Sequence, residues 1–187
     1  IFLVTLCTGL RRGEVCGLTW DSIDLERGTI HVNKQLQQVP GQSGNFRLTP
    51  TKNGKSRTIT VASFVVDALR QHKVRQTEAR LKAGPNWQDE GFVFTDEVGH
   101  RLSPNTVYHN YKRIVASIGL PKARLHDLRH TFATVSLHAG DDIKTVQENL
   151  GHATAAFTLA TYAHVTEEMK QDSANRMDQF IKGVFGA

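Results

Sequence analysis

The sequence has very little cysteine and no long apolar run. Only Cys7 and Cys16 occur among 187 residues, which excludes the disulfide framework of a small secreted domain and favours a reducing, cytoplasmic compartment. No stretch approaches the roughly 20 apolar residues that cross a bilayer, and the opening residues lack the charged start and the cleavage site of a signal peptide. We therefore expect a soluble globular protein with no membrane partner.

Acidic residues are slightly outnumbered by basic ones. Lys and Arg total 23 and Asp and Glu total 18, so the formal net charge is +5. Such a balance favours an anionic partner, although it also suits proteins that bind no nucleic acid. The first residue, Ile1, is not methionine and opens directly in an apolar run, so we expect the chain to be a fragment of a longer protein.

Strand patterns are confined to the early part of the chain. The segment "TIHV" at 29–32 is rich in β-formers with a period of two, and two further strands are predicted over 45–52 and 55–61. Between these two strands stand Asn53 and Gly54, the strongest short-range signal for a type I′ hairpin. The sequence therefore predicts that the second and third strands pair with each other.

Helical patterns account for most of the remaining chain. Gly9 is expected to close the first helix, and Ser103 with Pro104 to open another as N-cap and first helical residue. The predicted helices cover residues 1–7, 13–18, 63–82, 103–119, 125–139, 142–150, 155–163 and 167–184. No repeat or linker divides the chain. We expect one α+β domain over 1–187, mainly helical, with a small antiparallel three-stranded sheet near its N-terminal part packed beside a helical core.

The predicted hairpin has a lysine on each side of its turn. Lys52 and Lys55 would face each other across the strand ends, and like charges placed directly opposite destabilise a pair of strands. An anion bound between them would relieve this repulsion. The alternative is that both lysines are simply solvated at an exposed tip.

A histidine and an arginine share one face of the helix "LHDLRHTFATVSLHAG". His126 and Arg129 are three residues apart, which makes them neighbours on a helix. Each is adjacent in the sequence to a residue of an apolar stripe, so we expect both at the edge of the buried surface. There they could bind a phosphate. The stripe consists of Leu125, Leu128, Phe132 and Val135.

A metal site on this helix is not favoured. His126 and His130 have the i, i+4 spacing of metal ligands, but Asp127 stands directly after the first histidine, where the zinc-protease motif needs glutamate. A third ligand would also be required. His130 is better interpreted as a hydrogen-bonded structural histidine.

Two further segments hold candidate functional residues. In "ENLGHATAAFTLATYAHV", His152 follows a glycine at a helix end and Tyr162 comes ten residues later, although Tyr162 alone is typical of ordinary helix packing. In "TGLRRGE", Arg11 precedes Glu14 by three residues, which on its own suits a surface ion pair.

Together, these segments resemble the catalytic domains of tyrosine recombinases, the phage integrase family. The motifs "TGLRRGE", "TKNGKSR", "HDLRHTFAT", "LGH" and "TYAHV" occur in the order and approximate spacing of that family, from Thr8 to at least His164. The resemblance implies site-specific recombination of double-stranded DNA, as in integration or excision of a mobile element. Cleavage and rejoining would pass through a 3′-phosphotyrosyl intermediate, with no cofactor and no metal. A bacterial or phage origin, in the cytoplasm and associated with the nucleoid, is implied as well.

The resemblance also assigns roles to individual positions. Glu14 matches an acidic position that supports the first arginine. We expect the amino-terminal DNA-clamping domain usual in the family to be absent from this fragment. The segment from Thr154 to Ala160 lacks the usual consecutive Ser/Thr pair, since it reads Ala156-Phe157-Thr158. The implied catalytic residues are the arginine Arg11, the hairpin lysine Lys52, the pair His126 and Arg129, the second histidine His152, and the nucleophile Tyr162.

The chemistry of these residues agrees with that reaction. Two guanidinium groups would offset the charge that builds on the phosphate, His126 would serve as the base for a tyrosine hydroxyl, and Lys52 would protonate the leaving oxygen. A type IB topoisomerase activity, a non-catalytic DNA-binding module and a metal hydrolase stay open as alternatives.

A terminal apolar stripe is expected to serve assembly. Met177, Phe180, Ile181 and Val184 have the spacing of one helix face. Related recombinases dock such a helix onto a neighbouring protomer, so the expected form on DNA is a homo-oligomer, a tetramer. Packing of the helix on its own domain is the alternative.

Overall fold

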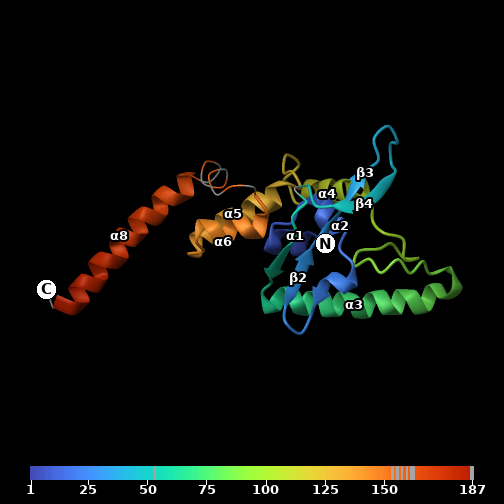
Figure 1. The fold of residues 1–187 in the computed structure, drawn as a ribbon, viewed down its shortest axis with the longest axis horizontal. Helices are drawn as coiled ribbons and strands as arrows, with labels where there is room; N and C mark the ends of the chain where they lie inside the picture. Colours follow the sequence, from blue (N-terminus) through green and yellow to red (C-terminus); the bar gives the residue numbers. More distant parts are fainter. Residues whose placement is uncertain are drawn as a thin grey trace.

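The computed structural model describes residues 1–52, 54–152, 154, 156, 158, 160 and 163–185. Short helices and strands come first along the chain, and longer helices follow (Figure 1). In chain order the elements are α1 (Phe2–Thr8), α2 (Arg12–Cys16), η1 (Trp20–Ser22), β1 (Ile23–Asp24), β2 (Thr29–Val32), β3 (Lys34–Gln38), β4 (Phe46–Pro50), β5 (Arg57–Thr60), α3 (Ser63–Ala83), η2 (Gly84–Asn86), α4 (Pro104–Ser117), α5 (Asp127–His138), α6 (Ile143–Leu150) and α8 (Ala163–Phe185). The predicted α+β class, mainly helical, is confirmed.

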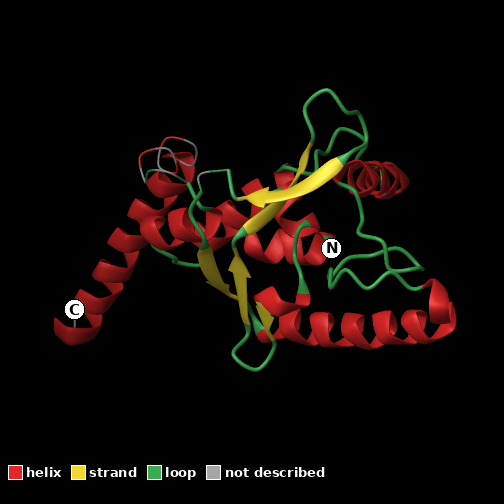
Figure 2. Ribbon diagram, turned by 45° about the vertical axis from the view of Figure 1, so that its right-hand side comes forward, coloured by secondary structure: helices red, strands yellow, loops and turns green. Residues whose placement is uncertain are grey.

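The strands form two small antiparallel sheets (Figure 2). One is three-stranded in the order β1-β2-β5, as the sequence predicts in number, and Ile30 lies opposite Ile59 within it. The other is a two-stranded ribbon of β3 and β4, in which Leu36 lies opposite Leu48. The three-stranded sheet buries the apolar face that carries Ile30 and Ile59, whereas in the ribbon Leu36 is buried and Leu48 is exposed.

The expected hairpin between β4 and β5 is wrong. Strand β4 pairs with β3, and β5 pairs with β2, so the segment between β4 and β5 connects two different sheets. The amide of Gly54 donates to the carbonyl of Thr51 at 2.8 Å, whereas the predicted turn would be closed by Lys52 and Lys55. Lys52 therefore sits inside the turn, and the expected juxtaposition of Lys52 and Lys55 across two paired strands does not occur.

Helix α2 lies directly against the ribbon. A Cβ atom on Gly13 would lie 2.7 Å from the carbonyl oxygen of Leu36, and one on Gly17 would lie 3.1 Å from the backbone of Gln35. Only residues without a side chain permit so close an approach. The two glycines therefore fix the ribbon next to the helix that carries Glu14.

A single large core joins the N-terminal helices to both sheets. Its members come from α1, α2, β2, β3, β4, β5, α3 and α4, with Phe94 contributed by the long loop after η2. A second, smaller core lies between α5 and α6. It consists of Ala133, Leu137, Val146 and Leu150.

The inward face of α5 differs from the predicted stripe. Val135, expected in the core, is 60% exposed, whereas Arg129, expected at its edge, is only 3% exposed. The residues that face inward are Arg129, Ala133 and Leu137. The physical reason is that α1 and α6 pack on α5, and the carbonyl groups of Gly9 and Leu150 accept hydrogen bonds from the buried guanidinium.

The last helix, α8, extends away from the rest of the chain (Figure 1). Met177, Phe180 and Ile181 are exposed along it, at 61%, 65% and 44%, while the side chain of Val184 lies outside the described residues. Most of the predicted helix 155–163 also falls outside them. Within the described ranges, every helix is too short or too polar to cross a bilayer.

Candidate active site

Glu14 is the centre of a buried charge cluster. Arg11 adopts an extended conformation just before α2, and its backbone amide donates to Oε2 of Glu14 at 2.9 Å, which caps the helix. The guanidinium of Arg11 also donates from Nη1 to Oε1 at 3.0 Å. Since the Glu14 side chain is 0% exposed, this pair is not the surface ion pair that the sequence allowed.

Arg57 is the second cation on Glu14, and the sequence did not single it out. Its Nη2 lies 2.8 Å from Oε2 and its Nη1 lies 3.1 Å from Oε1, so the two groups meet side by side. Burial alone would raise the pKa of Glu14, but the hydrogen bonds and charges of Arg57 and Arg11 outweigh it and hold the pKa below its ordinary value. Glu14 is therefore a carboxylate that aligns two arginines.

Three guanidinium groups bind the carboxyl end of α6. Arg57 donates from Nε to the carbonyl of Asn149 at 2.8 Å, Arg129 donates from Nη2 to that of Leu150 at 2.6 Å, and Arg11 donates from Nη2 to that of Gly151 at 3.1 Å. The last carbonyls of any helix accept no hydrogen bond from its own regular ladder, and the helix dipole makes this end negative. Consecutive carbonyl groups thus gather cations that come from three distant segments.

Gly151 makes this arrangement possible. Its φ of 61° is left-handed, and it ends α6 as the C-cap. A Cβ atom here would lie 2.9 Å from Nη1 and 3.1 Å from Cζ of Arg57. The glycine of the "LGH" motif is therefore needed for its backbone conformation and for the space that Arg57 occupies.

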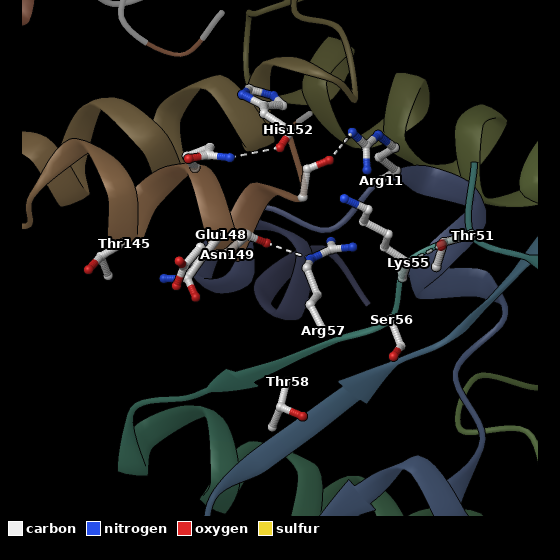
Figure 3. A pocket seen from close by; sticks show the side chains of 12 residues that line it. Arg11, Thr51, Lys55, Ser56, Arg57, Thr58, Thr145, Glu148, Asn149 and His152 are labelled. Atoms are coloured by element: carbon white, nitrogen blue, oxygen red, sulfur yellow. Dashed lines mark hydrogen bonds between the residues drawn. The ribbon is translucent and has the colours of Figure 1, made fainter. Parts of the chain in front are cut away.

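His152 follows this turn and is held from two sides. Gln147 donates to its backbone carbonyl at 3.1 Å (Figure 3), and its Nδ1 lies 2.8 Å from Oγ1 of Thr158. Burial, followed by the charges of Arg129 and Arg11, lowers the pKa of His152 to about 4. The imidazole is consequently neutral near pH 7 and can offer one N–H group.

His126 lies at the start of α5 and is exposed, unlike Arg129. Its ring meets that of His130 edge-on, with the centroids 4.8 Å apart. Although the residue as a whole is exposed, desolvation of part of its ring and then the charges of His130 and Arg129 lower the pKa of His126. A neutral imidazole in this place can accept a proton.

Two cavities are lined by the arginines that bind the end of α6. One, of about 450 Å³, is lined by Arg11, Arg57 and His152, and by Lys55, which points into it (Figure 3). The other, of about 360 Å³, is lined by His126 and Arg129, together with Arg12, Tyr108 and Arg124.

The structure brings some of the sequence-predicted site residues together and leaves others apart. Arg11, Arg129 and His152 come together at the end of α6, and His126 lies beside Arg129. Lys52 is exposed on its turn and, among the described residues, Lys55 rather than Lys52 lines the larger cavity. Tyr162 lies outside the described residues. Three guanidiniums against one buried carboxylate leave an excess of positive charge, which suits an anion such as a phosphate.

The signal for Arg57 was present in the sequence. In β5 it stands two residues before Ile59, which is buried, so both belong to the inward face of the strand. A charged residue on an inward face needs an opposite charge. The buried acid that meets it is Glu14.

Comparison with known proteins links this geometry to one family. The model of the phage integrase family matches residues 1–169. The chain is 35% identical to a tyrosine recombinase XerC-like protein of Caldanaerobacter subterraneus subsp. tengcongensis, over 97% of the chain and 49% of that protein. It is 30% identical to tyrosine recombinase XerA of Pyrococcus furiosus, over 98% and 56% respectively. The chain thus spans about half the length of these curated relatives.

A similar fold is found among solved structures. The Tn1549 transposon integrase in complex with transposon right end DNA superposes with a TM-score of 0.76 at 25% identity, over 95% of this chain and 57% of that one. The crystal structure of XerA recombinase gives a TM-score of 0.68 at 28% identity, over 91% and 55%. The arrangement of helices and sheets described above is therefore shared with these proteins.

Proposed function

The chain belongs to the phage integrase family, and on that basis we propose that it acts as the catalytic domain of a tyrosine-type site-specific DNA recombinase. The observation that carries the proposal is the convergence of Arg11, Arg57 and Arg129 on the end of α6, next to a neutral His152. A phosphodiester in this place would meet fixed positive charges on several sides. Electrostatic stabilisation of this kind commonly contributes more to the rate of an enzyme than any other single effect.

The proposed reaction begins with attack of the Tyr162 hydroxyl on the scissile phosphorus. The hydroxyl has an ordinary pKa near 10, so its proton passes to a base, and the neutral imidazole of His126 suits that role. The bond from phosphorus to the 5′-oxygen breaks as the bond to tyrosine forms. The products are a 3′-phosphotyrosyl link and a free 5′-hydroxyl.

The remaining groups support the phosphate and the leaving oxygen. Arg11 and Arg129 neutralise the charge on the nonbridging oxygens, and His152 donates a hydrogen bond to one of them. Lys52 supplies the proton that the leaving 5′-oxygen takes up. Because the phosphotyrosyl ester keeps the energy of the broken bond, the 5′-hydroxyl of a second strand can reverse the step without a cofactor.

Double-stranded DNA is the proposed partner, and integration or excision of a mobile element the proposed role. The relatives support it, since several are integrases and the Tn1549 integrase was solved with transposon right end DNA. The formal charge of +5 is in keeping with a polyanionic partner. The proposed setting is the cytoplasm of a bacterium, at the DNA.

We further propose that α8 docks on a second copy of the chain when several copies, a tetramer, assemble on DNA. The helix extends away from its own domain, and its exposed Met177, Phe180 and Ile181 form an apolar face. Such a face gains stability only when another surface covers it.

Covalent trapping tests the proposed function. A pool of duplexes with randomised recognition arms and one nick near the centre would be incubated with the protein, and adducts that resist denaturation would be recovered. Wild type should yield adducts whose modified peptide contains Tyr162, and Tyr162→Phe should yield none while still binding DNA. Tyr108→Phe, which removes a different tyrosine hydroxyl and keeps Tyr162, is the matched control: it should still form adducts at Tyr162, although Tyr108 lines the cavity of His126. Adducts formed by Tyr162→Phe would overturn the assignment.

A further inference from the structure

We infer that Thr158 is a positioning residue for His152, which it holds in the tautomer that presents Nε2–H to the phosphate. The inference rests on the proposed function and adds to it a residue that acts through another. Thr158 is 0% exposed, and its Oγ1 lies 2.8 Å from Nδ1 of His152, six residues earlier in the chain. A hydroxyl so placed is in hydrogen-bond contact with one specific ring nitrogen.

The need for such a residue follows from the chemistry of the neutral imidazole. A neutral ring carries its single proton either on Nδ1 or on Nε2, and the hydrogen bond made by one nitrogen selects the state of the other. Nonbridging phosphate oxygens only accept hydrogen bonds. For His152 to stabilise them through Nε2, that nitrogen must carry the proton, so Nδ1 must accept from a donor. The threonine hydroxyl can be that donor.

The surroundings keep this contact in one geometry. The backbone of His152 is fixed by Gln147 at the carbonyl and by the left-handed turn at Gly151, so the position of the ring depends on its side-chain torsions. Thr158 is β-branched, and its buried side chain has few rotamers available. Both partners of the hydrogen bond are therefore restrained before DNA binds, which is what preorganisation of a catalytic donor requires.

Two substitutions of Thr158 separate the effect of its hydroxyl group from the effect of its side-chain shape. Thr158→Val keeps the branched shape and removes the donor. By analogy with metal-bound histidines, where loss of the outer hydrogen-bond partner costs about 10- to 100-fold, it should lower the single-turnover cleavage rate by a similar factor. DNA affinity should not change. Thr158→Ser restores the hydroxyl and should recover most of the rate. Thr131→Val, a change in an exposed helical threonine of α5, is the matched control.

A double-mutant cycle distinguishes positioning from a general structural role. If Thr158 acts only through His152, then Thr158→Val should cause no further loss of rate in a His152→Ala background. An equal loss in both backgrounds would overturn the inference, because Thr158 would then act on something else. Thermal unfolding of each variant shows whether a lost rate reflects lost folding.

Nuclear magnetic resonance of the nitrogen-15-labelled wild-type protein gives a readout that does not depend on catalysis. We expect the His152 signal of a ring with Nδ1 unprotonated and Nε2 protonated, and the reverse assignment would overturn the inference. The proposed function fails separately, if wild type forms no covalent adduct at all. If wild type forms the adduct and Thr158→Val cleaves as fast as wild type, only the inference about Thr158 fails.

Discussion

Glu14 and Arg57, which are 43 residues apart in the chain, form a two-pronged ion pair with N–O distances of 2.8 and 3.1 Å. The carboxylate is completely buried, and the guanidinium side chain is 12% exposed. Through this contact β5 is attached to α2, and through the Nε atom of Arg57 it is also attached to the end of α6. One arginine thus connects three elements around the proposed phosphate site.

Removal of the charge on Glu14 should destabilise the protein strongly. In Glu14→Gln, Arg11 and Arg57 lose their common carboxylate, and breaking a buried ion pair from one side costs about 3 kcal/mol or more in the free energy of unfolding. Urea denaturation measures the loss. Glu148→Gln, an exposed change at the edge of the same cavity, should stay within about 0.5 kcal/mol of wild type. Equal losses for the two variants would contradict the buried role of Glu14.

Gly151→Ala should combine two penalties. A non-glycine residue in the left-handed region costs about 1 kcal/mol, and the new Cβ would contact Arg57, which cannot move without leaving Glu14 or Asn149. Gly119→Ala isolates the first penalty, because Gly119 has φ of 79° and open space around its Cβ position. We expect Gly151→Ala to be clearly less stable in urea than Gly119→Ala, and to cleave DNA more slowly. Matching stabilities would show that the space taken by Arg57 is not limiting.

Stability should decrease as the pH is lowered from about 6.5 towards about 4. His152 has a folded pKa below its ordinary value, so in this window the unfolded chain binds the proton more readily than the folded chain. The stability that the neutral His152 contributes is fully present above pH 6.5 and is lost as the pH falls towards 4. His152→Gln should therefore show a shallower decline in urea midpoint than wild type. His109→Gln, a change in an exposed histidine of α4, should decline as steeply as wild type, and an unchanged slope in His152→Gln would be the contrary result.

The role of Lys52 can be separated from that of Lys55 by changing the leaving group. Lys52→Ala should slow cleavage of ordinary DNA about 100-fold or more, as expected for loss of a general acid. A substrate with sulfur in place of the 5′-bridging oxygen leaves as a thiolate and needs no proton, so it should restore the rate of Lys52→Ala. Lys55→Ala should lose less, through the missing charge in the cavity, and should show no rescue. Rescue of Lys55→Ala alone would move the general-acid role to Lys55.

The apolar face of α8 should matter for assembly and not for binding of a single copy. Phe180→Ser removes a ring that would be buried against a second copy, at a cost of about 2 kcal/mol, or about 30-fold in cooperativity. Band-shift titration of DNA with two sites measures the cooperativity of binding. Deletion of the residues after Asp172 should abolish that cooperativity. Gln179→Ser, on the same helix, should leave cooperativity intact. Unchanged cooperativity in both Phe180→Ser and the deletion would refute docking of α8 on a second copy.

The sequence predicted the elements better than their pairing. Gly9, Ser103 with Pro104, and the long helix α3 stand where expected, because caps and helical periodicity are local signals. Strand β3 was missed, since "KQLQQ" is mostly polar and offers a single buried side chain, Leu36. The Asn53-Gly54 signal then linked β4 to β5, because pairing between distant strands leaves no local trace.

In the candidate site, too, local features could be predicted from the sequence and long-range contacts could not. Motif residues such as Arg11, Arg129 and His152 could be named in advance, because their types and spacing are distinctive. Their surroundings could not. The burial of Arg129 depends on carbonyl groups of Gly9 and Leu150, and the two-armed contact of Glu14 depends on Arg57 from the distant strand β5. Such contacts exist only after the chain has folded.

The binding of three guanidiniums to the last turn of α6 implies that the site is assembled and dismantled as one cooperative unit. If that turn frays, Arg11, Arg57 and Arg129 lose backbone acceptors together. Local opening of this kind exposes backbone amides to hydrogen exchange at a free energy below that of global unfolding. The exchange protection of the α6 amides and the catalytic competence of the site should therefore disappear over the same range of denaturant.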